Sequence, residues 1–228
     1  MGDKKQKEAM MKKDKQVLVV GACILFVVLM ILSGMGSGWL TMFTVVKPGD
    51  SVVVDYTLYD LNGNPILTSS QTVYTRAAEK GNSILFSKQL AMVTGQNLGK
   101  SIYPVSIYTG TGGWSKEYAL FSVEYDAINQ ALVGMKTGEQ KRIQLPNTSM
   151  AQEWSAEQLT RNGVNITDLS LGDGLAMSVS DNPEGMISNT SVVYTRIGQV
   201  ISRTNESVTV DFGYPSADIS IVSINAKN

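Results

Sequence analysis

The longest apolar stretch of the chain lies near its N-terminus, at residues 17–32, and contains no charged residue. A weaker uncharged run extends it to Val46. A membrane span needs roughly 20 apolar residues at a rise of 1.5 Å each. Trp39 and Phe43 would lie at its far end, where aromatic rings favour the membrane interface. The pattern predicts a transmembrane helix over residues 17–42, because the alternative, a buried core helix, would normally show a polar face.

The charges beside this stretch predict its orientation. Residues 1–16 carry six lysines against three acidic residues, and positive charge next to a span stays in the cytoplasm. We therefore expect a cytoplasmic tail, a single pass through the cell membrane, and an extracytoplasmic domain. Small residues at 33–38 leave a cleaved signal peptide as the alternative, but the length of the apolar stretch favours a retained anchor.

Beyond residue 46, apolar and polar positions alternate, which is typical of half-buried strands. Turn residues such as Asn62-Gly63-Asn64-Pro65 separate the alternating segments. The pattern predicts strands at residues 51–60, 66–75, 118–124, 139–145, 175–180, 192–202, 207–212 and 219–224. It predicts helices at residues 83–92, 126–133 and 151–161, the last beginning after Ser149.

The composition excludes several kinds of chemistry. The chain has no histidine, and its one cysteine, Cys23, lies in the apolar stretch. Catalytic triads built on histidine and ordinary zinc sites are therefore excluded, and no intrachain disulfide can form. The formal net charge of −1 gives no sign of nucleic-acid binding. We expect no cofactor and no metal. No pair of carboxylates stands out that would support a hydrolase.

Three segments carry a resemblance to a known family. KPGDSVVVDYTLYDLNGNPILTSS, at residues 47–70, resembles the opening strand pair of the FKBP-type peptidyl-prolyl isomerases. INQALVGMKTGEQKRIQLP, at residues 128–146, resembles their short helix, Gly-Met-Lys-x-Gly-Glu turn and basic strand. Residues 207–224 resemble a segment of the SlyD-like branch, in which a chaperone-like subdomain is inserted in the flap before that segment.

The resemblance implies a fold class and domain boundaries. The expected fold is an N-terminal transmembrane helix followed by a mainly β (α+β) FKBP-like domain at residues 47–146 and 207–228. An inserted β-rich flap subdomain would occupy residues 147–206, and a second, long insertion would occupy about 71–124. The second insertion contains Tyr103, Tyr108 and Trp114, which either cover the domain or dock another protein.

The resemblance also implies a binding pocket, at the positions Tyr56, Ile66, Leu67, Ile128, Met150 and Ile219. Only Tyr56 keeps the family's residue. Ile66 and Leu67 occupy the positions of a Phe-Asp pair in the family. Ile128 occupies the position of the large aromatic residue at the pocket floor, and Met150 that of the flap tyrosine. Prolyl isomerisation has a barrier of about 18–20 kcal/mol and needs no nucleophile. Whether the protein is active therefore depends on the residues that line the pocket.

Two functions follow from these changes. The first is a membrane-anchored foldase or chaperone that acts on exported polypeptide clients, with weak isomerase activity. The alternative is a catalytically inactive accessory subunit that docks in a membrane or envelope complex. Loss of the carboxylate and of the flap tyrosine favours the alternative, and the flap subdomain favours the first.

Overall fold

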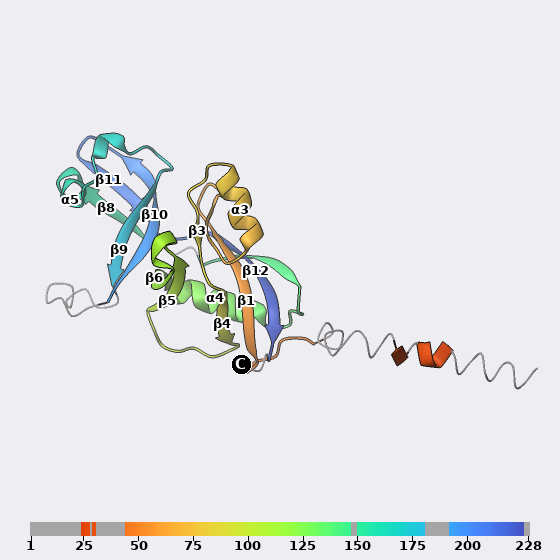
Figure 1. Cartoon of the computed structure of the whole chain (residues 1–228). Helices are drawn as coiled ribbons and strands as arrows, with labels where there is room; N and C mark the ends of the chain where they lie inside the picture. Colours follow the sequence, from red (N-terminus) through yellow and green to blue (C-terminus); the bar gives the residue numbers. More distant parts are fainter. Residues whose placement is uncertain (1–23, 28, 31–43, 147–149, 181–191, 226–228) are drawn as a thin grey trace, which may run out of the picture. The chain divides into compact units, whose positions relative to one another are not determined.

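The computed structural model describes residues 24–27, 29–30, 44–146, 150–180 and 192–225 (Figure 1). The chain divides into two units, residues 1–43 and 44–228. In the first unit the described residues are helical, and their apolar side chains are exposed. Within the described ranges, no helix is both long and apolar enough to cross a membrane.

The predicted fold class is therefore wrong in its transmembrane helix. Residues 24–27 and 29–30 of the predicted span are helical, but no described helix has the roughly 20 apolar residues that a ~30 Å apolar layer requires. The remainder of that segment and the predicted tail at residues 1–16 lie outside the described residues. What the described residues form is a mostly β structure with two curled sheets.

The first sheet has the strand order β3-β2-β1-β12-β7, with β4 also paired to β1. Its strands are β1 (Ser51–Tyr59), β2 (Pro65–Thr68), β3 (Leu85–Phe86), β4 (Leu90–Val93), β7 (Gln140–Gln144) and β12 (Ser216–Ile224). Val52, Val54, Tyr56 and Leu58 alternate along β1 and are buried, as a one-sided sheet requires. The buried face packs against the helix α4 (Ser122–Leu132).

The second sheet has the strand order β5-β6-β10-β11-β8, with β9 also paired to β10. Its strands are β5 (Ile102–Tyr108), β6 (Trp114–Phe121), β8 (Ala151–Ser155), β9 (Gly174–Ser180), β10 (Val193–Arg203) and β11 (Ser207–Asp211). The chain thus leaves the first sheet after β7, builds β8 to β11, and returns in β12. A bridge between Ser87 and Ile107 joins the two sheets.

One of the predicted elements is wrong in type, and two are right over only part of their length. Residues 66–75 form β2 and then the helix α3 (Gln71–Glu79), because the side chain of Ser70 caps that helix by accepting from Val73 N. Residues 83–92 form β3 and β4 instead of a helix, because they pair with β2 and β1. Residues 151–161 form β8 and only then the helix α5 (Ala156–Arg161).

Two 3-10 turns, η1 (Gly110–Gly112) and η2 (Ile166–Asp168), complete the described elements. Two apolar clusters fill the interior. The first core lies between the first sheet, α4 and the strands β5 and β6. The second core is smaller and lies within the second sheet, where α5 buries Leu159 against it.

Candidate functional site

The six pocket positions implied by the resemblance do not share one cavity. Tyr56, Leu67, Ile128 and Ile219 lie in the first core, and none is more than 1% exposed. Ile66 lies at the edge of the same core and is 9% exposed. Side chains buried to this degree fill space between the sheet and α4 and leave no surface there for a prolyl ring.

Met150 lies apart from the other five. It packs against the second core, and its backbone N–H donates to Asp211 Oδ1 at 3.3 Å. Burial raises the pKa of Tyr56, and among the described residues its hydroxyl has no hydrogen-bond partner. The structure thus places five of the six positions in the first core, whereas Met150, at the position of the flap tyrosine, packs against the second core.

A cleft of about 450 Å³ lies where the two sheets face each other. The β1–β2 turn contributes Asp60, Asn64 and Ile66, and the loop after α3 contributes residues 81–83. The opposite wall comes from β9 and β10, through Gly174, Ala176 and Ile197. The cleft therefore combines apolar side chains with a polar rim, which is the usual composition of a binding site. Ile66 is the one pocket position that lines it.

A smaller recess of about 30 Å³ adjoins this cleft. It shares Asp60, Ile66, Gly174 and Ile197 with the cleft. Its remaining lining residues are Gly172, Gly198, Gln199, Asp211, Gly213 and Tyr214. Glycine backbone and polar oxygen atoms therefore form much of its wall.

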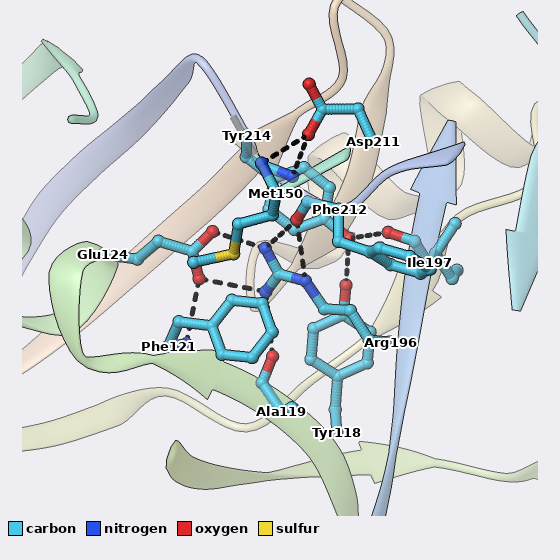
Figure 2. A network of polar contacts seen from close by, with 11 residues as sticks. Tyr118, Ala119, Phe121, Glu124, Met150, Arg196, Ile197, Asp211, Phe212 and Tyr214 are labelled. Carbon is cyan, nitrogen blue, oxygen red and sulfur yellow. Dashed lines mark hydrogen bonds and ion pairs between the residues drawn. The ribbon is translucent and has the colours of Figure 1, made fainter. Parts of the chain in front are cut away.

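A buried ion pair joins the second sheet to α4 (Figure 2). Arg196, on β10, is fully buried, and its guanidinium donates two hydrogen bonds to the carboxylate of Glu124 at the start of α4. Its other three hydrogen bonds go to the carbonyl oxygens of Ala119 at 2.8 Å and Phe212 at 2.7 and 3.1 Å. All five N–H donors of the guanidinium are thus satisfied within the protein.

Aromatic rings surround this guanidinium. The ring centroids of Tyr214, Phe121 and Tyr118 lie 3.9, 4.4 and 5.8 Å from its central carbon. Burial works against the charge of Arg196, but Glu124, Tyr214 and Tyr118 together outweigh it and raise the pKa of the guanidinium. Because the guanidinium has no free donor, the pair holds the second sheet to α4 and does not present a ligand site. Little in the sequence indicates this ion pair, since one arginine in a strand usually faces solvent.

The outer face of the first sheet carries a second, exposed ion pair. Arg142 on β7 contacts Asp218 on β12 at 2.6 Å, and both side chains are substantially exposed. The guanidinium lies 4.5 Å from the ring of Tyr59, whose hydroxyl donates to Asp218 at 2.7 Å. The hydrogen bonds from Arg142 and Tyr59 lower the pKa of Asp218. Partial burial and the bond to Asp218 raise the pKa of Tyr59 to about 12.

Four aromatic side chains form a surface cluster at the bridge between the sheets. Tyr74, Phe86, Trp114 and Tyr108 follow one another with ring centroids 5.2 to 5.7 Å apart. Trp114 and Tyr108 are both more than 40% exposed, and Lys88 Nζ lies 5.3 Å from the Trp114 ring. Tyr103 instead stacks on Tyr125 inside the first core. The long insertion thus both covers the domain and exposes rings.

In the parts of the chain that the structure describes, no three cysteine or acidic side chains are grouped to hold a metal. Compared with known proteins, the chain matches no protein-family model and shows no match to a curated protein. The function therefore has to be inferred from the geometry of the site and from the resemblance in the sequence.

Proposed function

We propose that residues 44–225 form a polypeptide-binding domain of the FKBP type, which binds unfolded client chains and has little isomerase activity. The observation that carries the proposal is the cleft of about 450 Å³ between the β1–β2 turn and β9–β10. It is large enough for several residues of an extended chain, and Ile66, Ala176 and Ile197 give it apolar walls.

The edge of β9 supports this proposal. Among the described strands, β9 is paired on one side only, to β10, and it contributes Gly174 and Ala176 to the cleft. An unpaired strand edge offers backbone N–H and C=O groups to an extended peptide. A client chain in the cleft would thus find backbone hydrogen bonds beside an apolar surface, irrespective of its exact sequence.

Two features argue that catalysis is weak. The carboxylate expected next to the pocket is replaced by Leu67, and the tyrosine of the flap is replaced by Met150, which packs with the second core. Of the remaining positions, Tyr56, Ile128 and Ile219 are buried in the first core and give a prolyl ring no access, and only Ile66 reaches the cleft. The proposed role is therefore that of a chaperone that holds chains, with isomerisation at most a minor activity.

The test uses the full chain with an aggregating client protein and, separately, a short proline peptide. Uncatalysed cis-to-trans conversion takes tens to hundreds of seconds, so even slight acceleration is measurable. We expect suppression of client aggregation and little or no acceleration of isomerisation. Ala176→Arg places a long charged side chain in the cleft and should abolish client binding. Ser178→Arg, on the same exposed face of β9 but outside the cleft lining, is the matched control.

Equal client binding by both arginine variants would rule out the cleft as the binding site. Rapid catalysis of isomerisation by the full chain would show that the buried positions open in solution. That result would restore the enzymatic interpretation.

A second candidate function, docking in a larger complex, is favoured by the exposed aromatic cluster around Trp114. Exposed Trp and Tyr side chains are common anchors of protein interfaces. If this function holds, the chain extracted from its native source migrates with a larger complex. Trp114→Ala would then release it from that complex while leaving client binding unchanged.

The proposal places the domain outside the cytoplasm. Its support is the sequence alone, namely the lysines of residues 1–16 followed by an uncharged interval. A C-terminal reporter enzyme that is active only after export tests this location. Activity of the reporter would support export, and inactivity of a stably produced fusion would refute it.

A further inference from the structure

One end of the first sheet contains the point where the chain enters the domain, together with the C-terminal ends of β4 and β12 (Figure 1). Val45 forms a bridge with Lys136, just after α4. The hydroxyl of Thr94, directly after β4, donates to the carbonyl oxygen of Lys47 at 2.5 Å. These contacts hold the entering chain beside the turn that follows α4 and the end of β4.

This end of the sheet exposes a group of apolar side chains. Five of them are 36 to 47% exposed, namely Val45, Val93, Leu98, Val133 and Val222. We call these five residues the entry face. Single exposed apolar residues are normal on protein surfaces, whereas several at one end of a domain indicate contact with another apolar surface. The entry face therefore calls for a partner that buries it.

The chain that leads to the entry face indicates which partner. Residues 17–46 contain no charged side chain, and the first charged residue after them is Lys47. Long, uncharged and apolar segments partition from water into lipid. If this interval lies in lipid, residue 44 is held at the lipid surface. The end of the first sheet that contains residue 44 would then lie against that surface.

The charges around the entry face fit this partner. Lys47, Lys100 and Lys136 are exposed beside it, and none of them forms an ion pair with a residue that the structure describes. The nearby carboxylates of Asp50 and Glu139 accept from the backbone N–H groups of Lys47 and Lys136, at 2.8 and 2.9 Å. Lysines beside an apolar surface are suited to anionic lipid headgroups.

We propose that the entry face rests on the surface of a lipid bilayer, with its apolar side chains at the headgroup boundary and the three lysines against anionic headgroups. Apolar side chains of surface-bound segments enter a bilayer by about 5–10 Å. None of the five residues lines the cleft, so the inference does not depend on polypeptide binding. The contact would fix the orientation of the domain relative to the membrane.

The first experiment places a fluorescent label on the entry face of the full chain. Cys23→Ser removes the natural cysteine, and Val93→Cys or Val133→Cys then provides one site for a nitrobenzoxadiazole label. The labelled chain is sedimented with vesicles of phosphatidylcholine and phosphatidylglycerol. We expect a blue-shifted, brighter emission at both positions, quenched by lipids that carry a nitroxide. Ile201→Cys is the matched control, since Ile201 is 41% exposed on β10, and its label should keep the emission it has in water.

The outcomes that overturn the proposal are distinct. The chain may fail to sediment with vesicles, or it may sediment while the labels at Val93 and Val133 keep their aqueous emission. An equal blue shift at Ile201 would show adsorption without a defined face. A blue shift that appears without lipid as the protein concentration rises would show that a second copy of the chain covers the entry face.

The second experiment tests the lysines. Each lysine beside an anionic surface contributes about fivefold to association, so Lys47→Gln with Lys136→Gln should weaken docking of the entry face on anionic vesicles about 25-fold. The blue shift of the label at Val93 measures this docking. Arg76→Gln with Lys80→Gln removes the same charge from the exposed side of α3 and should leave docking unchanged. Equal losses in both double variants, or no loss in either, would overturn the assignment of anionic lipid.

Discussion

The two sheets of residues 44–225 differ greatly in how much apolar structure supports them. The first core contains 23 buried apolar residues, whereas the second contains eight. The smaller core still carries three strand pairings between β8, β9, β10 and β11. The strands β5 and β6 of the second sheet pack in the first core. Since burial of apolar surface is the main favourable contribution to folding, the rest of the second sheet, β8 to β11, cannot rely on its own core to the same extent.

Polar links to the first sheet make up part of the difference. Gln199 reaches from β10 to Asp60 in the β1–β2 turn of the first sheet, and Arg196 reaches from β10 to Glu124 on α4, the helix that packs against that sheet. The strands β8 to β11 are therefore ordered largely through these attachments. Regions with few buried apolar contacts open at lower free energy than the global unfolding transition, so β8 and β11 should open before β1 and β12.

The largest effect is expected from Glu124→Gln, which removes the counter-charge of the buried Arg196. Breaking a buried ion pair by removing one partner costs about 3–5 kcal/mol, because the other charge stays buried and uncompensated. We expect a loss of this size in the free energy of unfolding, measured by urea denaturation. Glu157→Gln is the matched control, because its partner Arg161 is exposed on α5. Equal, small losses in both variants would show that the buried pair does not hold the second sheet to α4.

The next largest effect is expected from truncating one buried side chain in each core, which compares the two cores directly. Ile128→Ala and Leu159→Ala each remove a fully buried side chain, and such truncations cost about 2–5 kcal/mol. We expect Ile128→Ala to lower the global free energy of unfolding. Leu159→Ala should mainly accelerate hydrogen exchange in β8 and β11. If Leu159→Ala accelerates exchange equally in β1 and β12, the two sheets unfold as one unit and the comparison fails.

A smaller effect is expected where the second sheet is most tightly packed. A Cβ atom added at Gly198 would lie 2.5 Å from Val210 and 2.7 Å from the ring of Phe212. Overpacking of this kind costs about 1–3 kcal/mol, so Gly198→Ala should destabilise the second core. Gly174→Ala is the control, since its Cβ would make only an ordinary contact of 3.5 Å with Ile197. The measurement is the thermal unfolding midpoint of both variants. A lower midpoint for Gly198→Ala alone indicates strain from overpacking, and equal losses in both would indicate a general intolerance of alanine.

The smallest effect is expected on the first sheet, at Asp218. Its pKa is lowered in the folded state by Arg142 and Tyr59. Its contribution to stability is thus fully present above the unfolded value of 3.8 and is lost as the pH falls through the folded pKa. Because the pair is exposed, we expect Asp218→Asn to cost less than about 1 kcal/mol at pH 7. The urea midpoint of Asp218→Asn should also fall less than that of the wild type below pH 4.

Much of the strand structure could be predicted because its signal is local. The alternation at residues 139–145, 175–180, 207–212 and 219–224 predicts β7, β9, β11 and β12 within a few residues. The errors arise where tertiary pairing overrides the local pattern. Residues 83–92 have apolar positions at helical spacing, yet Leu85 and Phe86 pair with β2. The β-branched residues after Ser70 favour a strand, yet the Ser70 cap begins a helix there.

The candidate site could be predicted only in part, because its residues meet over long distances in the sequence. Asp60 and Gln199 are 139 positions apart, and Glu124 and Arg196 are 72 apart. No periodicity connects such pairs. Among the positions implied by the resemblance, Ile66 lines the cleft, whereas Tyr56, Leu67, Ile128 and Ile219 are buried as core. Membership of the FKBP family stays a prediction.

The position of β12 has a consequence for synthesis on the ribosome. β12 is the last described strand in the chain, yet it lies between β1 and β7 in the first sheet. Tyr59 donates a hydrogen bond to Asp218, which lies 159 positions later in the chain. The backbone N–H of Leu145, before residues 147–206, likewise donates to the carbonyl oxygen of Pro215, after them. Until β12 has left the ribosome, β1 and β7 have unpaired edges and the first core lacks its central strand.

A nascent chain of this protein can therefore complete most of its second sheet while its larger core is still open. Chains emerge at about 5–20 residues per second, so the open edges of β1 and β7 persist for seconds and are exposed to pairing with other chains. A protein that we propose to hold unfolded clients would, during its own synthesis, be such a client.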